Sequence, residues 1–170
     1  MSKRIAAAVN PAFAMQLFPW ISSKIYSYLC NMIVAERYHD ISCGHRVVGH
    51  EGKCRFLHGH NYRIHFTVLA QALDEVGRVV DFSVIKSTLC AWLEEHFDHK
   101  FLIWEKDELL PALKSIVADS LVVVPFNPTA ENLARYLVEA VGPEQLKDYP
   151  VQLISCKIEE TAKCSATFSL

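Results

Sequence analysis

The stretch 43–62 constrains this chain more than any other, because four of the eight histidines fall within it. His58 and His60 stand two residues apart and run into the alternating segment 62–68, which predicts a β-strand. Since residues i and i+2 of a strand share one face, the pair can present two imidazoles to a single ion. His45 precedes a glycine-containing turn, so the chain can double back and bring a third imidazole to the same place. The stretch therefore indicates a metal site of three histidines.

Two kinds of metal site are compatible with this spacing. Three imidazoles with an open fourth position are the pattern of a catalytic zinc ion, whereas four protein ligands close a structural site. Cys54, four residues before His58, could be that fourth ligand. The spacing leaves both alternatives open, and they differ in whether Cys54 lies on the metal. The remaining histidines of the predicted strands and helix are interpreted as packing or surface residues: His39, His50, His65 and His96.

Composition narrows the class of protein. The chain of 170 residues has a net charge of −2, and 51% of its residues are hydrophobic, as expected for one domain with a sizeable core. A net charge of −2 does not indicate the excess of lysine and arginine that nucleic-acid-binding proteins have. No apolar run is long enough to span a membrane. The six cysteines show no disulfide spacing, so we interpret them as reduced and the protein as cytoplasmic. Cys43 is interpreted as a small buried thiol.

Residues 1–31 are interpreted as an N-terminal extension of a single domain at 32–170. The extension begins with a basic segment, but the apolar run that follows stops at Asn10 and Pro11, without the features of a signal peptide. The sequence leaves open whether translation starts at Met1 or at Met32.

Hydrophobic periodicity predicts an α+β domain, with two helices on one face of an antiparallel sheet. Asp81 is placed to cap a helix that continues to Phe97, and a second helix opens at Pro128 and ends at Gly142–Pro143. The segment 101–120 is interpreted as a loop with one helical turn. The expected strands are 33–38, 58–68 with 79–80 as its hairpin partner, 121–124, 151–160 and 166–169.

The motif Cys54-x-x-x-His58-Gly59-His60, preceded by Ser42-Cys43-Gly44-His45-Arg46, resembles the 6-pyruvoyltetrahydropterin synthase family. The spacing from the cysteine to the His-Gly-His group resembles the bacterial 6-carboxytetrahydropterin synthase branch. Four further stretches resemble family segments in the same order: Val80–Phe82, Phe97–His99, Asn127–Asn132 and Ile158–Thr161. The resemblance covers roughly residues 32 to 168.

This resemblance implies a fold, an assembly and a set of site residues. The fold would be the tunnelling fold, in which trimers close a barrel and two trimers stack into a homohexamer with sites between subunits. Zn²⁺ would be bound by His45, His58 and His60. Cys54, Asp98 and His99 would be the catalytic residues. Glu160 would anchor the pterin ring, with Glu159 as its rival for that role.

The implied activity is that of a zinc-dependent carbon–carbon lyase. It would convert 7,8-dihydroneopterin triphosphate to 6-carboxytetrahydropterin, acetaldehyde and triphosphate, a step of queuosine biosynthesis. The alternatives are the pyruvoyl-forming synthase and a non-catalytic zinc-stabilised pterin-binding module. The chain departs from many relatives at Lys100, where they have a second histidine, and at Cys43, where a small residue such as alanine is usual. The triphosphate site is not readable as a motif, and its candidates are Lys53, Arg55 and Lys163.

Overall fold

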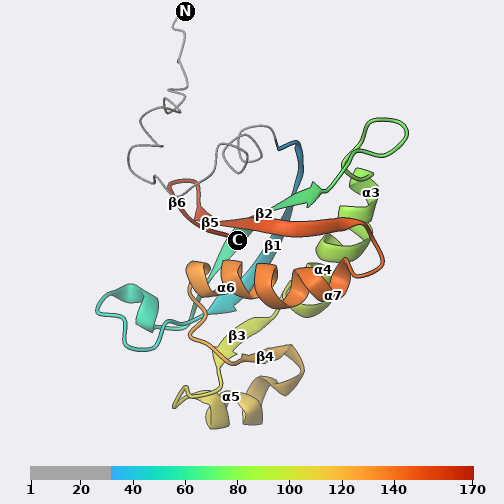
Figure 1. The fold of residues 1–170 in the computed structure, drawn as a ribbon. Coiled ribbons are helices and arrows are strands. Elements are labelled where there is room, and N and C mark those ends of the chain that lie inside the picture. Colours follow the sequence, from blue (N-terminus) through green and yellow to red (C-terminus); the bar gives the residue numbers. More distant parts are fainter. Residues whose placement is uncertain (1–31) are drawn as a thin grey trace, which may run out of the picture. The chain divides into compact units, whose positions relative to one another are not determined.

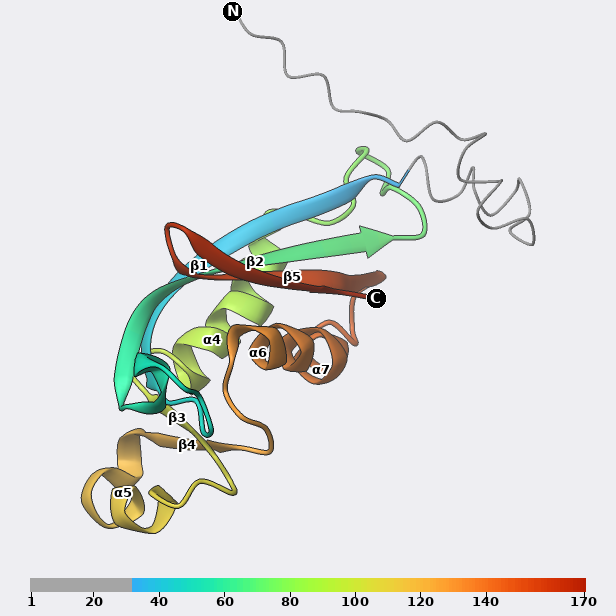
Figure 2. The same ribbon diagram turned by 90° about the vertical axis from the view of Figure 1, so that its left-hand side faces the viewer.

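The computed structural model describes residues 32–170, which form one six-stranded sheet with helices against one of its faces (Figures 1 and 2). The strand order is β4-β3-β1-β2-β5-β6. The proposed extension 1–31 lies outside the described residues. None of the helices in the described part is long and apolar enough to cross a membrane.

Two long strands form the centre of the sheet. β1 (Val34–His45) and β2 (His58–Ala70) pair antiparallel along their whole length, from Val34 opposite Leu69 to His45 opposite His58. The alternation predicted for β2 is confirmed, because Tyr62, Ile64, Phe66 and Val68 are all buried. This apolar stripe continues the face on which His58 and His60 lie, so the core fixes the side on which the histidines emerge.

The sheet is completed by two further pairs of strands. β5 (Val151–Thr161) pairs antiparallel with β2, and β6 (Cys164–Ser169) pairs antiparallel with β5. On the other side, β3 (Phe101–Trp104) and β4 (Leu121–Val124) are short and run parallel to β1. The sheet is therefore mixed, and the expectation of an antiparallel sheet was wrong for this half.

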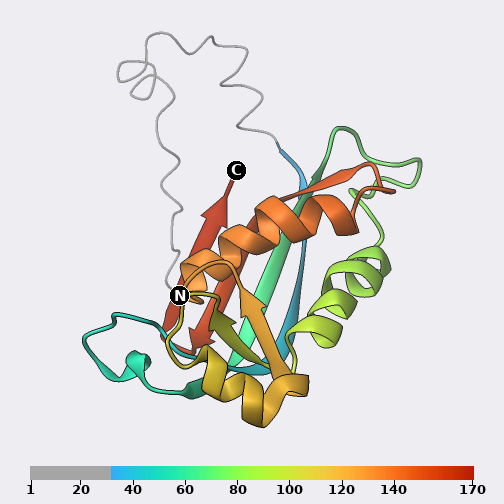
Figure 3. The same cartoon turned by 90° about the horizontal axis from the view of Figure 1, so that it is seen from below.

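Two helical segments cover the face of the sheet that bears the histidines (Figures 2 and 3). The first comprises α3 (Phe82–Ile85), a π-helical turn and α4 (Ala91–His96), and it begins where the carboxylate of Asp81 accepts the Ser83 N–H, as predicted. The second comprises α6 (Ala130–Tyr136), a π-helical turn and α7 (Gly142–Gln145). Leucines of both segments are buried against the strands: Leu89, Leu93, Leu133 and Leu137.

A third helix corrects the two-helix expectation. The segment 101–120, expected as a loop, contains β3 and α5 (Leu110–Val117), which connects β3 to its parallel neighbour β4. Parallel strands need a crossover connection, and α5 supplies it. Figure 3 shows α5 beside these short strands, at one end of the sheet.

Two boundary expectations were also wrong. Val79 and Val80 lie in a bend and form no hairpin with β2. The helical segment does not stop at Gly142–Pro143 but continues through α7. A Cβ atom on Gly142 would lie 2.8 Å from the Cβ of Leu153, so this glycine permits close packing of the helix on β5 rather than ending the helix.

Candidate metal centre and its surroundings

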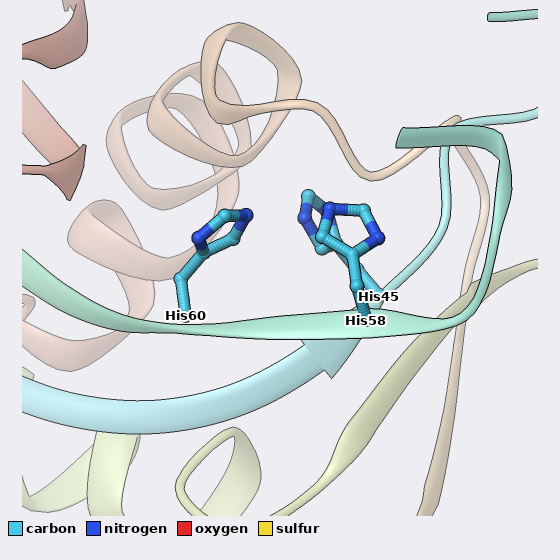
Figure 4. Close-up of side chains that lie close together, drawn as sticks. All are labelled: His45, His58 and His60. Atoms are coloured by element: carbon cyan, nitrogen blue, oxygen red, sulfur yellow. The ribbon is translucent and has the colours of Figure 1, made fainter. Parts of the chain in front are cut away.

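Three imidazoles converge at one end of the β1–β2 pair. His45 ends β1, while His58 and His60 open β2, and one ring nitrogen of each lies within 4.8 Å of the other two. Figure 4 shows the three rings on the same side of the strands, turned toward one another. The arrangement follows from the strand register, since His45 lies directly opposite His58 and His60 is two residues further along the same face.

The hydrogen bonds of the rings show which nitrogens are available to a ligand. His45 Nδ1 donates to the carbonyl of Pro128 at 2.6 Å, and His58 Nδ1 donates to the carbonyl of Phe56 at 2.8 Å. The Nε2 atoms of both rings are buried and have no hydrogen-bond partner. A backbone carbonyl that fixes one ring nitrogen as the donor leaves the lone pair of the other for a metal ion. Two rings are thus oriented as ligands.

Burial favours the neutral, metal-binding form of His45 and His60. His45 is 1% exposed, and burial lowers its pKa to about 4, despite the opposing hydrogen bond to Pro128. Burial also lowers the pKa of His60, although the nearby carboxylate of Glu160 acts in the other direction. Neutral imidazole is the form that coordinates metals.

Cys54 lies in the loop between β1 and β2, in a short 3₁₀ turn at Lys53–Arg55. Its carbonyl accepts the Val47 N–H at 2.8 Å, which closes the base of the loop. In the described part of the chain, the group of side chains close enough to share an ion consists of the three histidines alone, without Cys54. This geometry differs from the closed His₃Cys arrangement that the spacing had left open.

Asn127 holds the same loop, a role that the sequence analysis did not predict. Its Oδ1 accepts the Val48 N–H at 2.9 Å, and its Nδ2 donates to the Val48 carbonyl at 2.9 Å. Because Pro128 next to it accepts from His45, this short segment supports both the loop and the cluster. Every residue has a backbone carbonyl, so the role of the Pro128 carbonyl cannot be recognised from the type of residue. Only the Asn-Pro-Thr pattern could have indicated that this segment matters.

Asp98 and His99 lie at the exposed edge of β1 rather than in the cluster. Asp98 Oδ1 accepts the Ser42 N–H at 2.8 Å, and the His99 N–H donates to the Ser42 carbonyl at 2.7 Å. His99 adopts a left-handed backbone with φ of 55°, and its Nδ1 lies 2.8 Å from Asp98 Oδ2. Burial alone would raise the pKa of Asp98, but its hydrogen bonds to Ser42 and His99 outweigh this and lower it. The side chain of His99 is 82% exposed.

The two rival glutamates lie in different surroundings. Glu160 Oε1 lies 3.9 Å from His45 Nε2, with its side chain 26% exposed. Glu159 is instead paired with Lys157 at 2.5 Å and with His65 at 3.3 Å. His65 lies one residue out of phase with His58, His60 and the buried stripe, on the other face of the sheet. The structure thus places Glu160 beside the cluster and Glu159 away from it.

Fold and site together define a class of protein. Three imidazoles, two of them with unpartnered Nε2 atoms, and no fourth protein ligand in the group among residues 32–170, are the donor set of an open metal centre. They stand on a mixed sheet with helices on one face, and the family model described as 6-pyruvoyl tetrahydropterin synthase matches residues 34–170.

Individual relatives agree with the family match. A protein of Rickettsia typhi named 6-carboxy-5,6,7,8-tetrahydropterin synthase is 35% identical over 134 residues, covering 78% of this chain and 97% of the relative. An uncharacterised protein of Wolinella succinogenes has a crystal structure with a TM-score of 0.72 at 25% identity, covering 82% of this chain and 98% of that one. The Caenorhabditis elegans 6-pyruvoyl tetrahydropterin synthase shares the fold, with a TM-score of 0.58 at 22% identity and coverage of 82% and 96%.

This chain belongs to the 6-pyruvoyl tetrahydropterin synthase family. It has the tunnelling fold of that family, and it is an enzyme of the lyase class.

Proposed function

We propose that this chain is a zinc-dependent 6-carboxy-5,6,7,8-tetrahydropterin synthase. The substrate is 7,8-dihydroneopterin triphosphate, which with water gives 6-carboxytetrahydropterin, acetaldehyde and triphosphate, in the cytoplasmic route to queuosine. The observation that carries the proposal is the open cluster of His45, His58 and His60, in which backbone carbonyls orient the rings of His45 and His58. The relatives named for this reaction support the choice of product.

The residues of the cluster fit a zinc ion. Imidazole nitrogen is a common ligand of Zn²⁺ in proteins. The Nε2 atoms of His45 and His58 are buried without a hydrogen-bond partner, so their lone pairs are available to the ion. When bound, zinc would supply Lewis acidity toward the adjacent hydroxyl groups of the substrate side chain. The carbonyls of Pro128 and Phe56 hold the two rings in place, so little reorganisation is needed on metal binding.

Cys54 is the base that we assign to proton removal from the substrate side chain. It is half-buried in a loop fixed by Val47 and Asn127, and it lies outside the group of metal-binding side chains. A thiol that is not coordinated keeps its nucleophilicity and basicity. On this proposal the loop brings Cys54 to the substrate side chain, while the thiol stays off the ion.

Asp98 and His99 are assigned to proton transfer between oxygen and carbon. The bond between them orients the imidazole, as a general acid–base pair requires. The exposed side chain of His99 fits a site that a neighbouring subunit of a homohexamer completes. In such a site, Asp98 and His99 of one copy would act on substrate bound beside the histidine cluster and Cys54 of another copy. Exposed strand edges also invite pairing between copies.

Glu160 is assigned to the pterin ring. Its carboxylate beside His45 can accept two N–H donors from the guanidine-like edge of a pterin in a charge-assisted bidentate contact. Glu159 is committed to Lys157 and His65 and is not available for this role.

Product analysis tests the proposal against its alternatives. The purified protein is incubated with 7,8-dihydroneopterin triphosphate, and the products are identified by mass spectrometry. We expect 6-carboxytetrahydropterin and acetaldehyde. A pyruvoyl product would assign the chain to the pyruvoyl-forming synthases instead. Tight pterin binding without any product, in protein with a full complement of zinc, would identify a binding module.

A further inference from the structure

Tyr62 packs against the histidine cluster and has no role in the mechanism above. It follows His60 by two residues on β2, so it lies on the same face of the sheet. Its ring meets two of the imidazoles edge-on, with ring centres 5.8 Å apart for His45 and 5.4 Å apart for His60, at interplanar angles of 79° and 78°. Edge-to-face contact is a favoured geometry for aromatic rings, so the position of the Tyr62 ring beside the cluster is well defined.

The hydroxyl of Tyr62 is buried without a hydrogen-bond partner. The residue is 1% exposed, and within residues 32–170 no protein group forms a hydrogen bond with its hydroxyl oxygen. An unsatisfied buried hydroxyl destabilises the fold, whereas phenylalanine would fill the same space without this cost. The hydroxyl therefore contributes nothing to the packing that its ring does not already provide.

The core beside Tyr62 offers this hydroxyl no partner. A small cavity of about 10 Å³ adjoins the residue, and apart from Tyr62 and Cys43 the residues that line it are apolar. A buried water needs two to four polar partners and at least about 10–15 Å³ of such space. The cavity is at the lower limit of that size, and it adds only a weakly polar thiol. A water on the core side does not account for the hydroxyl.

The ionisable groups near the hydroxyl belong to the proposed site. Burial raises the pKa of the Tyr62 hydroxyl, and the charges of Cys43, Glu160 and Cys54 act in the same direction. Glu160 and Cys54 are the residues that we assign to the pterin ring and to proton removal. The hydroxyl thus lies within electrostatic range of both, beside the imidazole of His45 that also neighbours Glu160.

The ligand chemistry that fits this hydroxyl is an oxygen atom that carries or gains negative charge. A phenol is protonated at neutral pH and can donate one hydrogen bond, which is stronger when the acceptor is charged. A donor that is fixed before the ligand arrives stabilises such charge without reorganisation. Tyr62 meets this condition, because the histidine rings and the core hold its ring in place.

We propose that the Tyr62 hydroxyl donates a hydrogen bond to an oxygen of the ligand held at the histidine cluster, and that this bond strengthens as the oxygen gains charge. The inference rests on the proposed function for the identity of that oxygen, which belongs to the side chain of dihydroneopterin triphosphate. It adds a donor that keeps its proton to the groups assigned to proton transfer. From sequence, Tyr62 was only the first residue of the alternating segment 62–68.

The test compares Tyr62→Phe, which removes the hydroxyl and keeps the ring, with Tyr149→Phe. Tyr149 is an exposed tyrosine in the bend before β5 and serves as the matched control. The probe is acetohydroxamate, which chelates zinc through oxygen, and its affinity for the zinc-loaded proteins is measured by calorimetry. Tyr62→Phe should bind it at least about tenfold more weakly than the control does, as loss of a hydrogen bond to a charged oxygen predicts. The zinc content of the two variants, determined before and after, should be equal.

A stability measurement distinguishes a donor to a ligand from a structural hydroxyl. In zinc-free protein without probe, the urea midpoint of Tyr62→Phe should equal or exceed that of the unmodified protein, because the substitution removes an unsatisfied polar group. A lower midpoint would show that the hydroxyl is bonded within the fold, and the assignment to a ligand would be wrong.

Kinetics connect the hydroxyl to the proposed reaction. For dihydroneopterin triphosphate, kcat of Tyr62→Phe should fall at least about tenfold while KM changes much less, because the bond is strongest in the transition state. Equal acetohydroxamate affinity in Tyr62→Phe and the control, or no binding by either, would overturn the role of Tyr62 even if carboxytetrahydropterin forms normally. A clear difference in acetohydroxamate affinity, in protein that forms no product, would instead overturn the proposed function and leave the donor assignment standing.

Discussion

The three-histidine cluster and the Asp98–His99 pair are built in contrasting ways. The cluster is fixed by the register of two long strands within one chain, and carbonyls of the surrounding segments orient two of its rings. The pair lies in the turn before β3 and makes two hydrogen bonds to Ser42 of β1, and the side chain of His99 is 82% exposed. One chain therefore brings the three imidazoles together but leaves His99 of the proposed acid–base pair facing outward.

This difference suggests where the two halves of the chemistry are assembled. The three imidazoles come from one chain, and backbone carbonyls of the same chain orient two of them, so folding pre-organises this set without a partner. His99, exposed and in a left-handed turn, would on our proposal act on substrate held by another copy. The predictions below test this division, beginning with the group on which the chemistry depends most.

Replacing His58 by alanine should have the largest effect. Loss of one of three ligands should release the metal and lower turnover by at least about 10³-fold, since Lewis-acid stabilisation is worth several kcal/mol. Metal content by mass spectrometry and steady-state kinetics check this. His65→Ala is the control, because His65 lies on the same strand but pairs with Glu36 and Glu159. A His58→Ala protein with full zinc and full turnover would remove the cluster from the mechanism.

Replacing Cys54 by alanine should separate metal binding from chemistry. We expect unchanged zinc content and circular dichroism, with kcat lower by about 10²–10⁴-fold, the usual contribution of a positioned base. Cys164→Ala, which alters an exposed cysteine on β6, should leave turnover unchanged. If the Cys54→Ala protein lost its zinc, the thiol would be a ligand and the site a structural one.

Mixing two inactive variants tests the comparison directly. Cys54→Ala and His99→Ala proteins, unfolded together and refolded, should regain turnover if the two residues of a site come from different copies. Random assortment gives both intact residues in about a quarter of such sites. Residues from a single copy would never be intact together in the mixture, and no activity would return. The measurement is turnover of the mixture relative to each variant refolded alone.

Much of the site could be predicted from the sequence because its geometry depends on strand register. The i, i+2 spacing of His58 and His60 and the alternation up to Val68 already fix a common face. What could not be predicted depends on contacts between segments distant in the chain. The carbonyl of Pro128 behind His45 and the clamp of Asn127 on Val48 involve backbone atoms about eighty residues away, which leave no periodic signal.

The fold was predictable where elements are long and less so where they are short. The predicted helix from Asp81 to Phe97 is present, and Ile85, Leu89 and Leu93, at helical spacing, are buried, whereas Phe82 at the first turn is exposed. β3 has only four residues and pairs in parallel, so neither length nor alternation distinguishes it from a loop. Gly142 was interpreted as a helix end because sequence does not show that β5 lies against it.

The smallest predicted effect concerns the stability that Asp98 gives to the sheet edge. Its pKa is lower in the folded protein than its ordinary value of 3.8, so its contribution is present above that pH and is lost as pH falls through the folded value. Asp98→Asn keeps the shape but removes the charge, and it should lower the free energy of unfolding by about 0.5–1.5 kcal/mol at pH 7, the range for one hydrogen bond. Urea denaturation at decreasing pH should show this gap closing below the ordinary pKa. A gap that stayed constant down to the most acidic conditions would mean that the carboxylate charge does not hold the pair on β1, and the edge would then owe its geometry to the backbone contacts of Ser42 alone.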